Sequence, residues 1–389
     1  MRVLLAGPVD GHALADSLGC ARDGVPVGYG YSPLNALIPG LLDLGVAVEL
    51  VTLDPSLDSP HSCDLGPVRL TTCPVRGAPR YRARARSGDL FAREIAYLRA
   101  VIDASRCDVV HAHWTYEFAE AALRSGKPHL ITMHDVGWDC LRHYRDPYRA
   151  MRLIMKYRVM LRARAVSAVS PYVASQAWHY GYFGKADVVP NPIAWAPLAA
   201  KSPERPVIVT VGSDSHLKNV AASLAAFSPI RARFASAQLH LFGPGLDAHG
   251  AFSNAPPGVT CHGEVAHDRL MHFLQERATL LIHPSRSETF GLIIGEAKMR
   301  GVPVVAGRNS GGVGYVVGEA GGVLVDINQP ARIASAALAL LSAPDHYRAL
   351  QQAAHDDAHA RFGVAQVASG YLSLYRRIAM RRGACGSAS

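Results

Sequence analysis

Short apolar segments alternate with helical segments along almost the whole chain, and this alternation limits the available folds more than any other feature. Residues 1–6 form an apolar run that ends at Gly7, as expected of a buried strand. Leucine and isoleucine recur at helical spacing over residues 32–44, and residues 46–52 form a second apolar run. A strand, a helix and a strand in this order predict a βαβ unit and a parallel sheet.

The alternation is interrupted once, by the proline-rich residues 190–206, and it starts again at residue 207. We interpret the interruption as a linker between two α/β Rossmann-like domains that face a cleft. Ligands of such sheets bind outside the carboxyl ends of the strands. Further strands are predicted over residues 108–112, 129–133, 165–169, 207–211, 238–242, 259–262, 279–283 and 303–306, and further helices over 117–124, 171–180, 220–227, 268–276 and 292–300.

The composition favours a soluble protein with large buried cores. Hydrophobic residues make up 49% of the 389 residues and charged residues 18%, which argues against disorder. The 7 cysteines are odd in number and never spaced C-x-x-C, which argues against a disulfide framework and a cysteine zinc site. No run of 18 apolar residues occurs, and residues 3–7 are too short for a signal peptide. We expect a cytoplasmic protein.

The net charge of +9 favours anionic partners, and two stretches concentrate the positive charge. One runs from Arg76 to Arg86 with Arg80, Arg82 and Arg84 between them, as in an exposed loop or edge strand. The other runs over residues 142–164, from Arg142 to Arg164, and mixes basic with apolar residues as in an amphipathic helix. Each stretch is either a solvated surface or a docking site for an anionic membrane or a lipid-diphosphate acceptor.

Nucleic acid is not an expected partner. Aromatic residues make up only 7% of the chain, and no motif of a nucleic-acid reader occurs. Two histidines, His111 and His113, share one strand face, but no third metal ligand is evident near them in the sequence. We therefore expect neither nucleic acid nor a metal.

The segment over residues 284–305 is the most informative one for function. It follows a predicted buried strand and opens a helix, so Glu288, Thr289, Phe290 and Gly291 would lie in the loop and the first turn. Free backbone N–H groups and the helix dipole favour an anion there. Glu288 and Glu296 could bind hydroxyl groups on either side of a bound diphosphate. The alternative is a capped helix whose glutamates are only solvated.

Three other positions carry candidate chemistry. Lys218 lies six residues after Gly212 and before a predicted helix, where it either contacts a phosphate or is merely solvated. Gly28 and Gly30 form a G-x-G pair whose amides could approach phosphate, although a plain turn would look the same. His134 follows a predicted strand, where a histidine serves either in the site or in the core, and Asp135 beside it either orients it or caps a turn.

The segment from Glu288 to Glu296, with Phe-Gly-Leu inside it, resembles the E-x7-E signature of retaining glycosyltransferases with the GT-B fold, specifically glycosyltransferase family 4. The resemblance extends over nearly the whole chain. The other matching pieces are residues 108–113, 132–135, 169–170, 189–193, 241–245, 311–312 and the closing residues 371–377.

The resemblance implies the domain organisation. Residues 1–195 would form the N-terminal, acceptor-side domain, and residues 196–365 the C-terminal domain that binds a nucleotide-sugar donor. Residues 366–389 would form a helix that returns to the N-terminal domain, followed by a tail.

The resemblance also implies the roles of individual residues. Glu288 would face the donor sugar, Lys218 would neutralise the leaving diphosphate, and His134 would lie near the donor sugar carbon; these three would be the catalytic residues. Glu296 would bind the ribose hydroxyls. No metal or cofactor is implied. The remaining donor-binding residues would be Gly28, Gly30, Gly212, Ser213, Phe290, Gly291 and Leu292.

The sequence departs from the family pattern at two places. Ser213 stands where the family commonly has arginine, so one phosphate contact would be missing or supplied by Arg286 or Arg308. Tyr315 stands where a glutamate is expected downstream of the Gly-Gly pair.

The resulting hypothesis is sugar transfer from a nucleotide-diphosphate sugar to an acceptor hydroxyl with retention of anomeric configuration, in the synthesis of a polysaccharide, a lipid-linked glycan or a glycosylated metabolite. Two alternatives remain: a nucleotide-sugar 2-epimerase of the same fold, and a non-catalytic partner subunit that binds nucleotide sugar or polyanions. The two basic stretches extend the localisation hypothesis to the inner membrane face.

Overall fold

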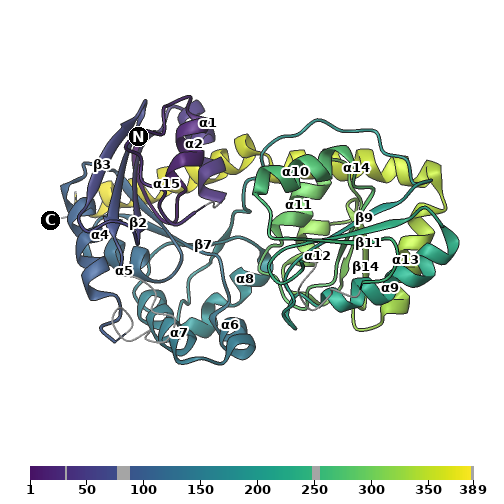
Figure 1. Ribbon diagram of the computed structural model, residues 1–389. Coiled ribbons are helices and arrows are strands. Elements are labelled where there is room, and N and C mark those ends of the chain that lie inside the picture. Colours follow the sequence, from purple (N-terminus) through teal and green to yellow (C-terminus); the bar gives the residue numbers. More distant parts are fainter. Residues whose placement is uncertain (31–32, 77–87, 248–254, 387–389) are drawn as a thin grey trace. The chain divides into compact units, whose positions relative to one another are not determined.

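The computed structural model describes residues 1–30, 33–76, 88–247 and 255–386, and the side chains up to residue 380. The chain divides into two α/β units (Figure 1). One comprises Met1–Pro192 together with Val364–Ser389, and the other comprises Ile193–Gly363. The prediction of two Rossmann-like domains is therefore confirmed.

The N-terminal unit is built on a sheet with the strand order β3-β4-β2-β1-β5-β6-β7-β8. All of its described neighbours pair in parallel except β3 and β4, which are antiparallel. The hairpin of β3 and β4 was not among the predicted strands, because polar residues alternate with apolar ones in it. The strands are β1 (Arg2–Ala6), β2 (Ala47–Asp54), β3 (His61–Leu65), β4 (Val68–Pro74), β5 (Val109–His113), β6 (His129–Met133), β7 (Val166–Ala168) and β8 (Asp187–Val188).

Helices cover both faces of this sheet, as parallel sheets require. Val3 and Leu5 of β1 face a core shared with α1, α2 and α15, whereas Leu4 and Ala6 face a core shared with α4, α5 and α7. The alternation follows from the two-residue period of a strand. The helices are α1 (Gly11–Ser17), α2 (Pro33–Asp43), α4 (Ala92–Ala104), α5 (Glu117–Arg124), α6 (Gly137–Tyr144), α7 (Pro147–Met160), α8 (Pro171–Ser175), the 3-10 helix η1 (Ala177–Tyr180) and α15 (Val364–Gly386).

The last helix, α15, belongs to the N-terminal unit although it ends the chain (yellow in Figure 1). It packs on α2, β5 and β6, and Val367, Tyr371 and Tyr375 are each at most 2% exposed. The Oη of Tyr375 lies 2.7 Å from Nδ1 of the fully buried His111. The expectation that the final helix returns to the N-terminal domain is thus confirmed.

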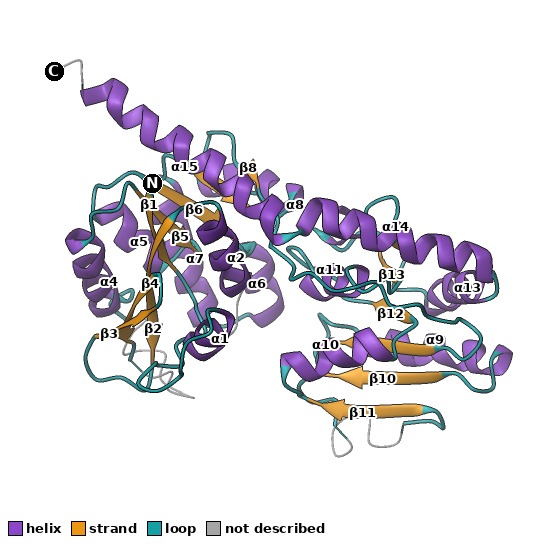
Figure 2. Cartoon of the chain, turned by 90° about the horizontal axis from the view of Figure 1, so that it is seen from above, coloured by secondary structure: helices purple, strands orange, loops and turns teal. Residues whose placement is uncertain are grey.

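The C-terminal unit contains a six-stranded sheet with the order β11-β10-β9-β12-β13-β14, parallel throughout (Figure 2). Its strands are β9 (Val207–Val211), β10 (Gln238–Phe242), β11 (Val259–Gly263), β12 (Leu280–His283), β13 (Val304–Gly307) and β14 (Gly322–Val325). Its helices are α9 (Val220–Arg233), α10 (His267–Glu276), α11 (Leu292–Lys298), α12 (Val313–Val317), α13 (Pro330–Leu341) and α14 (Pro344–Phe362).

Two of the predicted helices are divided in the structure. Residues 142–164 do not form one helix, because Arg145 takes a left-handed conformation (φ 48°) that ends α6, and Asp146 caps α7 by accepting a hydrogen bond from the Arg149 N–H. The predicted helix over residues 171–180 likewise divides into α8 and η1. No helix of the described residues is long and apolar enough to cross a bilayer.

The arginine-rich stretch from Arg76 to Arg86 lies mostly outside the described residues. Its first member, Arg76, donates hydrogen bonds to Asp89 and to the buried Glu94. Arg76 is therefore an anchor between β4 and α4.

We expect Tyr375→Phe to destabilise the N-terminal unit by about 1–3 kcal/mol, because it leaves the buried His111 without the tyrosine hydroxyl as partner. Tyr97→Phe, which removes the hydroxyl of a half-exposed tyrosine on α4, is the control. Urea denaturation followed by fluorescence measures both; equal stabilities of the two variants would show that the Tyr375 hydroxyl does not contribute to holding α15.

Candidate active site

The strand order of the C-terminal sheet places two loops side by side. From β9 the chain proceeds to β10 and β11 on one side, and then returns to β12, β13 and β14 on the other. The order therefore reverses between β9 and β12, which pair directly. In open parallel sheets, ligands bind at the carboxyl edge where the order reverses. The loops there are residues 212–219 and 284–291.

The two loops meet through an ion pair between Lys218 and Glu288. Lys218 Nζ lies 2.6 Å from Glu288 Oε1. The lysine side chain is 32% exposed and the glutamate side chain 15% exposed, so the pair is open to solvent on the lysine side. The structure thus brings together two of the three predicted catalytic residues.

A third group, His283 at the end of β12, faces the same carboxylate. Its Nε2 lies 3.2 Å from Glu288 Oε1, and its side chain is only 2% exposed. Burial by itself would raise the pKa of Glu288, but His283 and Lys218 outweigh it and hold that pKa well below its usual range. Glu288 is therefore a carboxylate at any ordinary pH and accepts hydrogen bonds only.

His283 was not identified from the sequence. It was assigned only to a predicted strand, because a histidine that ends an apolar run looks like any strand residue. His283 belongs to the site only because Glu288, five residues later in the chain, turns its side chain back toward the end of β12.

Arg286 fixes the two loops to one another. Its backbone N–H donates to the Leu217 carbonyl at 2.8 Å, and its guanidinium donates to the His216 carbonyl and to the side-chain oxygens of Asn219 and Asn328. These bonds occupy the guanidinium as a structural brace. The Arg308 guanidinium donates to the Leu324 carbonyl. Each of the two arginines keeps further N–H groups, so their suggested contact with a phosphate stays a prediction.

The Glu288 backbone is held by the glycine turn after β13. Its N–H donates to the Ser310 carbonyl at 3.2 Å, and its carbonyl accepts from the Gly312 N–H at 2.8 Å. Beyond it, Phe290 is buried against Tyr315 and Phe362. Phe290 therefore positions the loop through its side chain, and Tyr315 contributes a ring to this small aromatic cluster instead of a carboxylate.

Gly291 and Glu296 lie on either side of the start of α11. Gly291 adopts a left-handed conformation (φ 85°) and is the N-cap residue of α11, whose first residue is Leu292. Glu296 follows on the second turn, where its Oε1 lies 2.8 Å from Nε2 of His267 at the start of α10. This hydrogen bond raises the pKa of His267 above its ordinary value. His267 is the second site residue that the sequence did not reveal.

The loop after β9 passes close to the loop after β10. The Gly212 N–H donates to the Phe242 carbonyl at 2.9 Å. An ideal Cβ on Gly243 would lie 1.7 Å from the Gly212 carbonyl oxygen, and Gly243 has φ 129°, so only glycine fits there. Ser213 follows Gly212 and donates its hydroxyl hydrogen to Ser215 at 2.8 Å.

The predicted residues of the N-terminal unit form a separate cluster. His134 Nε2 lies 2.9 Å from Nδ1 of His113, whose ring lies beside that of His111. Burial lowers the pKa of His134 to about 4 and those of His111 and His113 well below 6.5. All three are neutral imidazoles near neutral pH. Among the described residues, no group of histidine, cysteine and carboxylate side chains is arranged to hold a metal ion.

The carboxylate next to His134 is held firmly. Asp135 forms an ion pair with Lys156, which is fully buried, and accepts a hydrogen bond from the Tyr116 hydroxyl at 2.6 Å. Lys156 lowers the pKa of Asp135 despite its burial. Asp135 thus fixes the segment after β6 that carries His134.

The Gly28 and Gly30 loop is ordered by contacts of its own. The Gly28 N–H donates to Asp54 Oδ2 at 2.7 Å, and an ideal Cβ on Gly28 would lie 2.3 Å from the Val9 carbonyl oxygen. The Gly28 amide is therefore already hydrogen-bonded. At Gly30, by contrast with Gly28, a Cβ would meet nothing within 4 Å among the described atoms. The glycine at position 28 is required for a close backbone approach.

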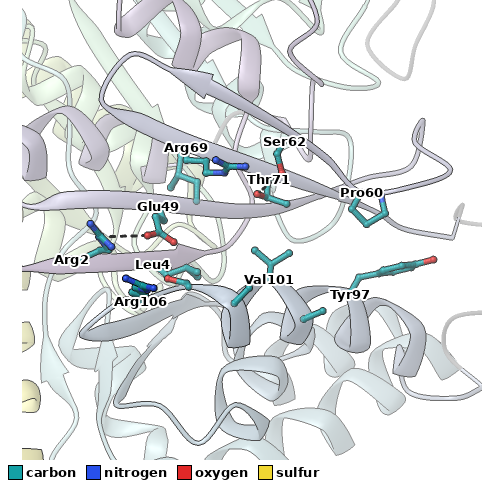
Figure 3. A pocket seen from close by; sticks show the side chains of 14 residues that line it. Arg2, Leu4, Glu49, Pro60, Ser62, Arg69, Thr71, Tyr97, Val101 and Arg106 are labelled. Atoms are coloured by element: carbon teal, nitrogen blue, oxygen red, sulfur yellow. Dashed lines mark hydrogen bonds and ion pairs between the residues drawn. The ribbon is translucent and has the colours of Figure 1, made fainter.

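A pocket of about 650 Å³ lies elsewhere in the N-terminal unit, among the amino-terminal halves of β1, β2 and β4 and the end of α4 (Figure 3). Arg2, Arg69 and Arg106 line it, and Arg2 lies 3.6 Å from Glu49. The pocket is remote from the carboxyl edge where the order of this sheet reverses, between β1 and β5. It contains none of the predicted site residues.

We expect the stability that His267 contributes to depend on pH. Because the pKa of His267 is raised, its contribution is complete below about pH 6.5 and is lost as the pH rises through the folded-state value. His267→Gln should therefore lower the free energy of unfolding more at about pH 6 than at about pH 9, by less than ~1 kcal/mol since the side chain is partly exposed.

Urea denaturation at the two pH values measures this difference. His272→Gln, at an exposed histidine of the same helix, is the control. An equal loss at both pH values would mean that the His267–Glu296 contact contributes no charge-dependent stability.

Two family models match the chain. Residues 34–196 match the model described as Glycosyltransferase Family 4, and residues 197–357 match the model described as Glycosyl transferases group 1. The two matches together run from residue 34 to residue 357 without a gap.

Curated relatives carry the name D-inositol 3-phosphate glycosyltransferase. The protein from Segniliparus rotundus is 29% identical over 375 residues, covering 87% of this chain and 82% of the relative. The one from Catenulispora acidiphila is 41% identical over 99 residues, covering 25% of this chain and 23% of the relative. The chain therefore matches less than a quarter of the length of this second relative.

Solved structures share the fold over nearly the whole chain. Sucrose-phosphate synthase from Thermosynechococcus elongatus superposes with a TM-score of 0.75 at 20% identity, covering 97% of this chain and 99% of that one. The Anabaena protein HepE, solved in complex with UDP and glucose, gives a TM-score of 0.65 at 17% identity, covering 97% and 100%. With its two parallel-sheet α/β units and the two family matches, the chain belongs to the GT-B glycosyltransferases of the family 4 type.

Proposed function

We propose that the protein transfers a sugar from a nucleotide-diphosphate sugar to an acceptor hydroxyl, with retention of the anomeric configuration. The observation that carries the proposal is the pairing of Lys218 with Glu288 at the point where the strand order of the C-terminal sheet reverses. A cation and a carboxylate at that edge suit a ligand that combines phosphate with hydroxyl groups.

Lys218 is the residue to which we assign the leaving diphosphate. Its ammonium group is part-exposed and is held by one carboxylate. A bound diphosphate carries more negative charge than Glu288, so it would share or take over this cation. As the bond between sugar and phosphate breaks, charge accumulates on the departing oxygen, and a preplaced cation stabilises that charge.

Glu288 and Glu296 are assigned to hydroxyl groups. Glu288 is permanently ionised and would accept hydrogen bonds from the donor sugar. Glu296 keeps one carboxylate oxygen beyond the one that faces His267, and it would accept hydrogen bonds from the ribose. The His267 contact would hold this carboxylate in one orientation before the nucleotide arrives.

Retention would follow from a front-face route. The C1–O bond to the diphosphate breaks with its electron pair going to the phosphate oxygen. The acceptor oxygen bonds to C1 on the same face, and its proton passes to that phosphate oxygen. His134, with a pKa of about 4, would be a neutral hydrogen-bonding group on the acceptor-side unit and would carry no charge into the reaction.

The relatives suggest which ligands to try first. HepE was solved with UDP and glucose and also with UDP-glucose, and the Segniliparus relative is named for inositol 3-phosphate. A uridine donor and a phosphorylated polyol are therefore the first pair to test. A 2-epimerase would return a nucleotide sugar that is epimerised at C2 and would leave the acceptor unglycosylated, and a binding-only subunit would leave the donor unchanged.

We expect one of UDP, GDP, ADP and TDP to raise the unfolding temperature selectively. A ligand at about 100 times its dissociation constant adds roughly 2.7 kcal/mol to the stability of the state that binds it. Glu296→Ala should abolish the response, whereas Glu264→Ala, at an exposed residue after β11, should retain it. Thermal unfolding of the three proteins measures the effect, and no response to any nucleotide would contradict the proposed donor site.

We expect Lys218→Ala to lower kcat by about 10²–10³, as for the loss of one transition-state donor. Arg332→Ala, which removes an exposed cation of α13, should leave kcat unchanged. Nucleotide release and mass analysis of the glycosylated acceptor are the measurements. Unchanged turnover of Lys218→Ala would remove the assigned role, and an anomer-inverted product would contradict retention.

A further inference from the structure

Large apolar side chains are exposed together on one surface of the N-terminal unit. Phe183 is 85% exposed, Leu161 64%, Trp178 59%, Ile154 55% and Trp138 50%. They lie on α6, on α7 and directly after it, on η1 and in the segment after η1. Single exposed apolar residues are common, but a group of this size marks an interaction surface.

Contacts join the elements that carry these residues. Trp138 donates its Nε1–H to the Tyr157 hydroxyl on α7 at 3.2 Å, and the Tyr157 ring lies 5.5 Å from that of Tyr180 on η1. A Cβ on Gly181 would lie 2.4 Å from Cδ2 of Leu161. Leu161 therefore covers the turn that carries Phe183.

The periodicity of α7 and a surface pocket relate further members of this group to one another. Ile154 of α7 and Leu161, which caps the carboxyl end of α7 in a helical conformation, are seven residues apart and so lie on the same side. A pocket of about 500 Å³ is lined by Trp138 and Arg142 of α6 on one side and by Gln176 and His179 beside η1 on the other. The elements that carry the exposed residues thus pack on one another, α6 and η1 each against α7.

Positive charge borders these apolar side chains. Arg142, Arg158 and Lys185 are exposed on the same elements or directly after them. Two of the nearby acids differ in their partners: Asp187 pairs with Arg377, whereas Asp139 accepts a hydrogen bond from the uncharged Tyr172 hydroxyl at 2.5 Å. Asp146 caps α7 and pairs with Arg149. Asp187 and Asp146 are thus paired with arginines other than those of this surface, and the three exposed basic groups exceed the charge of Asp139.

We propose that this surface docks the protein on an anionic phospholipid bilayer. We name it the basic aromatic face, defined by Trp138, Ile154, Leu161, Trp178 and Phe183 with Arg142, Arg158 and Lys185. Tryptophan and phenylalanine rings enter the headgroup region of a bilayer, and arginine and lysine remain at the phosphates. A bilayer with anionic lipids attracts such basic groups electrostatically.

The charge pattern favours a bilayer over a second copy of the chain. A second copy would present the same basic groups to one another, because the chain carries a net charge of +9 and two-fold contacts are self-complementary. Like charges at a contact oppose association. A bilayer rich in phosphates presents the opposite charge over the whole face. The inference is independent of the proposed donor site, which lies on the other unit.

The experiment is co-sedimentation of the full chain with vesicles. Vesicles of phosphatidylcholine containing about one third phosphatidylglycerol should bind the protein at low salt, and vesicles of phosphatidylcholine alone should bind it at least about tenfold more weakly. High salt should reduce the binding to anionic vesicles, because salt screens the attraction.

Variants separate the apolar from the electrostatic contribution. Phe183→Ser with Trp178→Ser should lower the vesicle partition coefficient by about tenfold or more. Trp195→Ser is the matched control, because Trp195 is 62% exposed but lies in the C-terminal unit; it should bind as the unchanged chain does. Arg158→Glu and Lys185→Glu should each lower partition by about fivefold or more.

Three results would overturn the inference. One is absence of binding to anionic vesicles at low salt. Another is equal binding by the Phe183→Ser, Trp178→Ser variant and the Trp195→Ser control. The third is a dimer in sedimentation velocity that the Phe183→Ser change dissociates, because it would show that a second copy occupies the face. Nucleotide-dependent thermal stabilisation, measured in parallel, reports on the donor site and on the folding of each variant.

Discussion

The contact between β9 and β12 is the constraint on which the candidate site depends. These strands are far apart in the chain, and their parallel pairing is where the order of the C-terminal sheet reverses. Only this pairing brings the loop of Lys218 to the loop of Glu288. The Arg286 brace and the Ser310–Gly312 turn then fix the two loops and so hold the ion pair in place.

Burial of charged side chains explains which groups are paired in the two units. A carboxylate as enclosed as Glu288 is unfavourable unless it is paired, and Lys218 and His283 supply that pairing. The same logic operates in the N-terminal unit, where Lys156 is fully buried beside Asp135. There, however, the three neighbouring histidines are kept neutral by burial. One unit thus presents a part-exposed cation beside an ionised carboxylate, and the other presents neutral histidines.

Much of the fold could be predicted because parallel strands that are buried on both faces have continuous apolar sequences. Both sheets and the returning final helix were predicted in this way or through the family resemblance. The β3–β4 hairpin was missed because its alternating pattern is weaker, and the break at Arg145 was missed because a left-handed arginine leaves no compositional sign. His283 and His267 were missed for a different reason: their partners are distant in the sequence.

The sequence by itself determined the two α/β units, the positions of the glutamates 288 and 296 at a strand-to-helix junction, and the excess of positive charge. These are local properties, set by periodicity and residue type. The tertiary structure decided which groups face one another: that Arg286 braces loops, that Tyr315 packs in an aromatic cluster, and that Phe183 and Leu161 share a surface. Such contacts join residues through space, and no spacing along the chain encodes them.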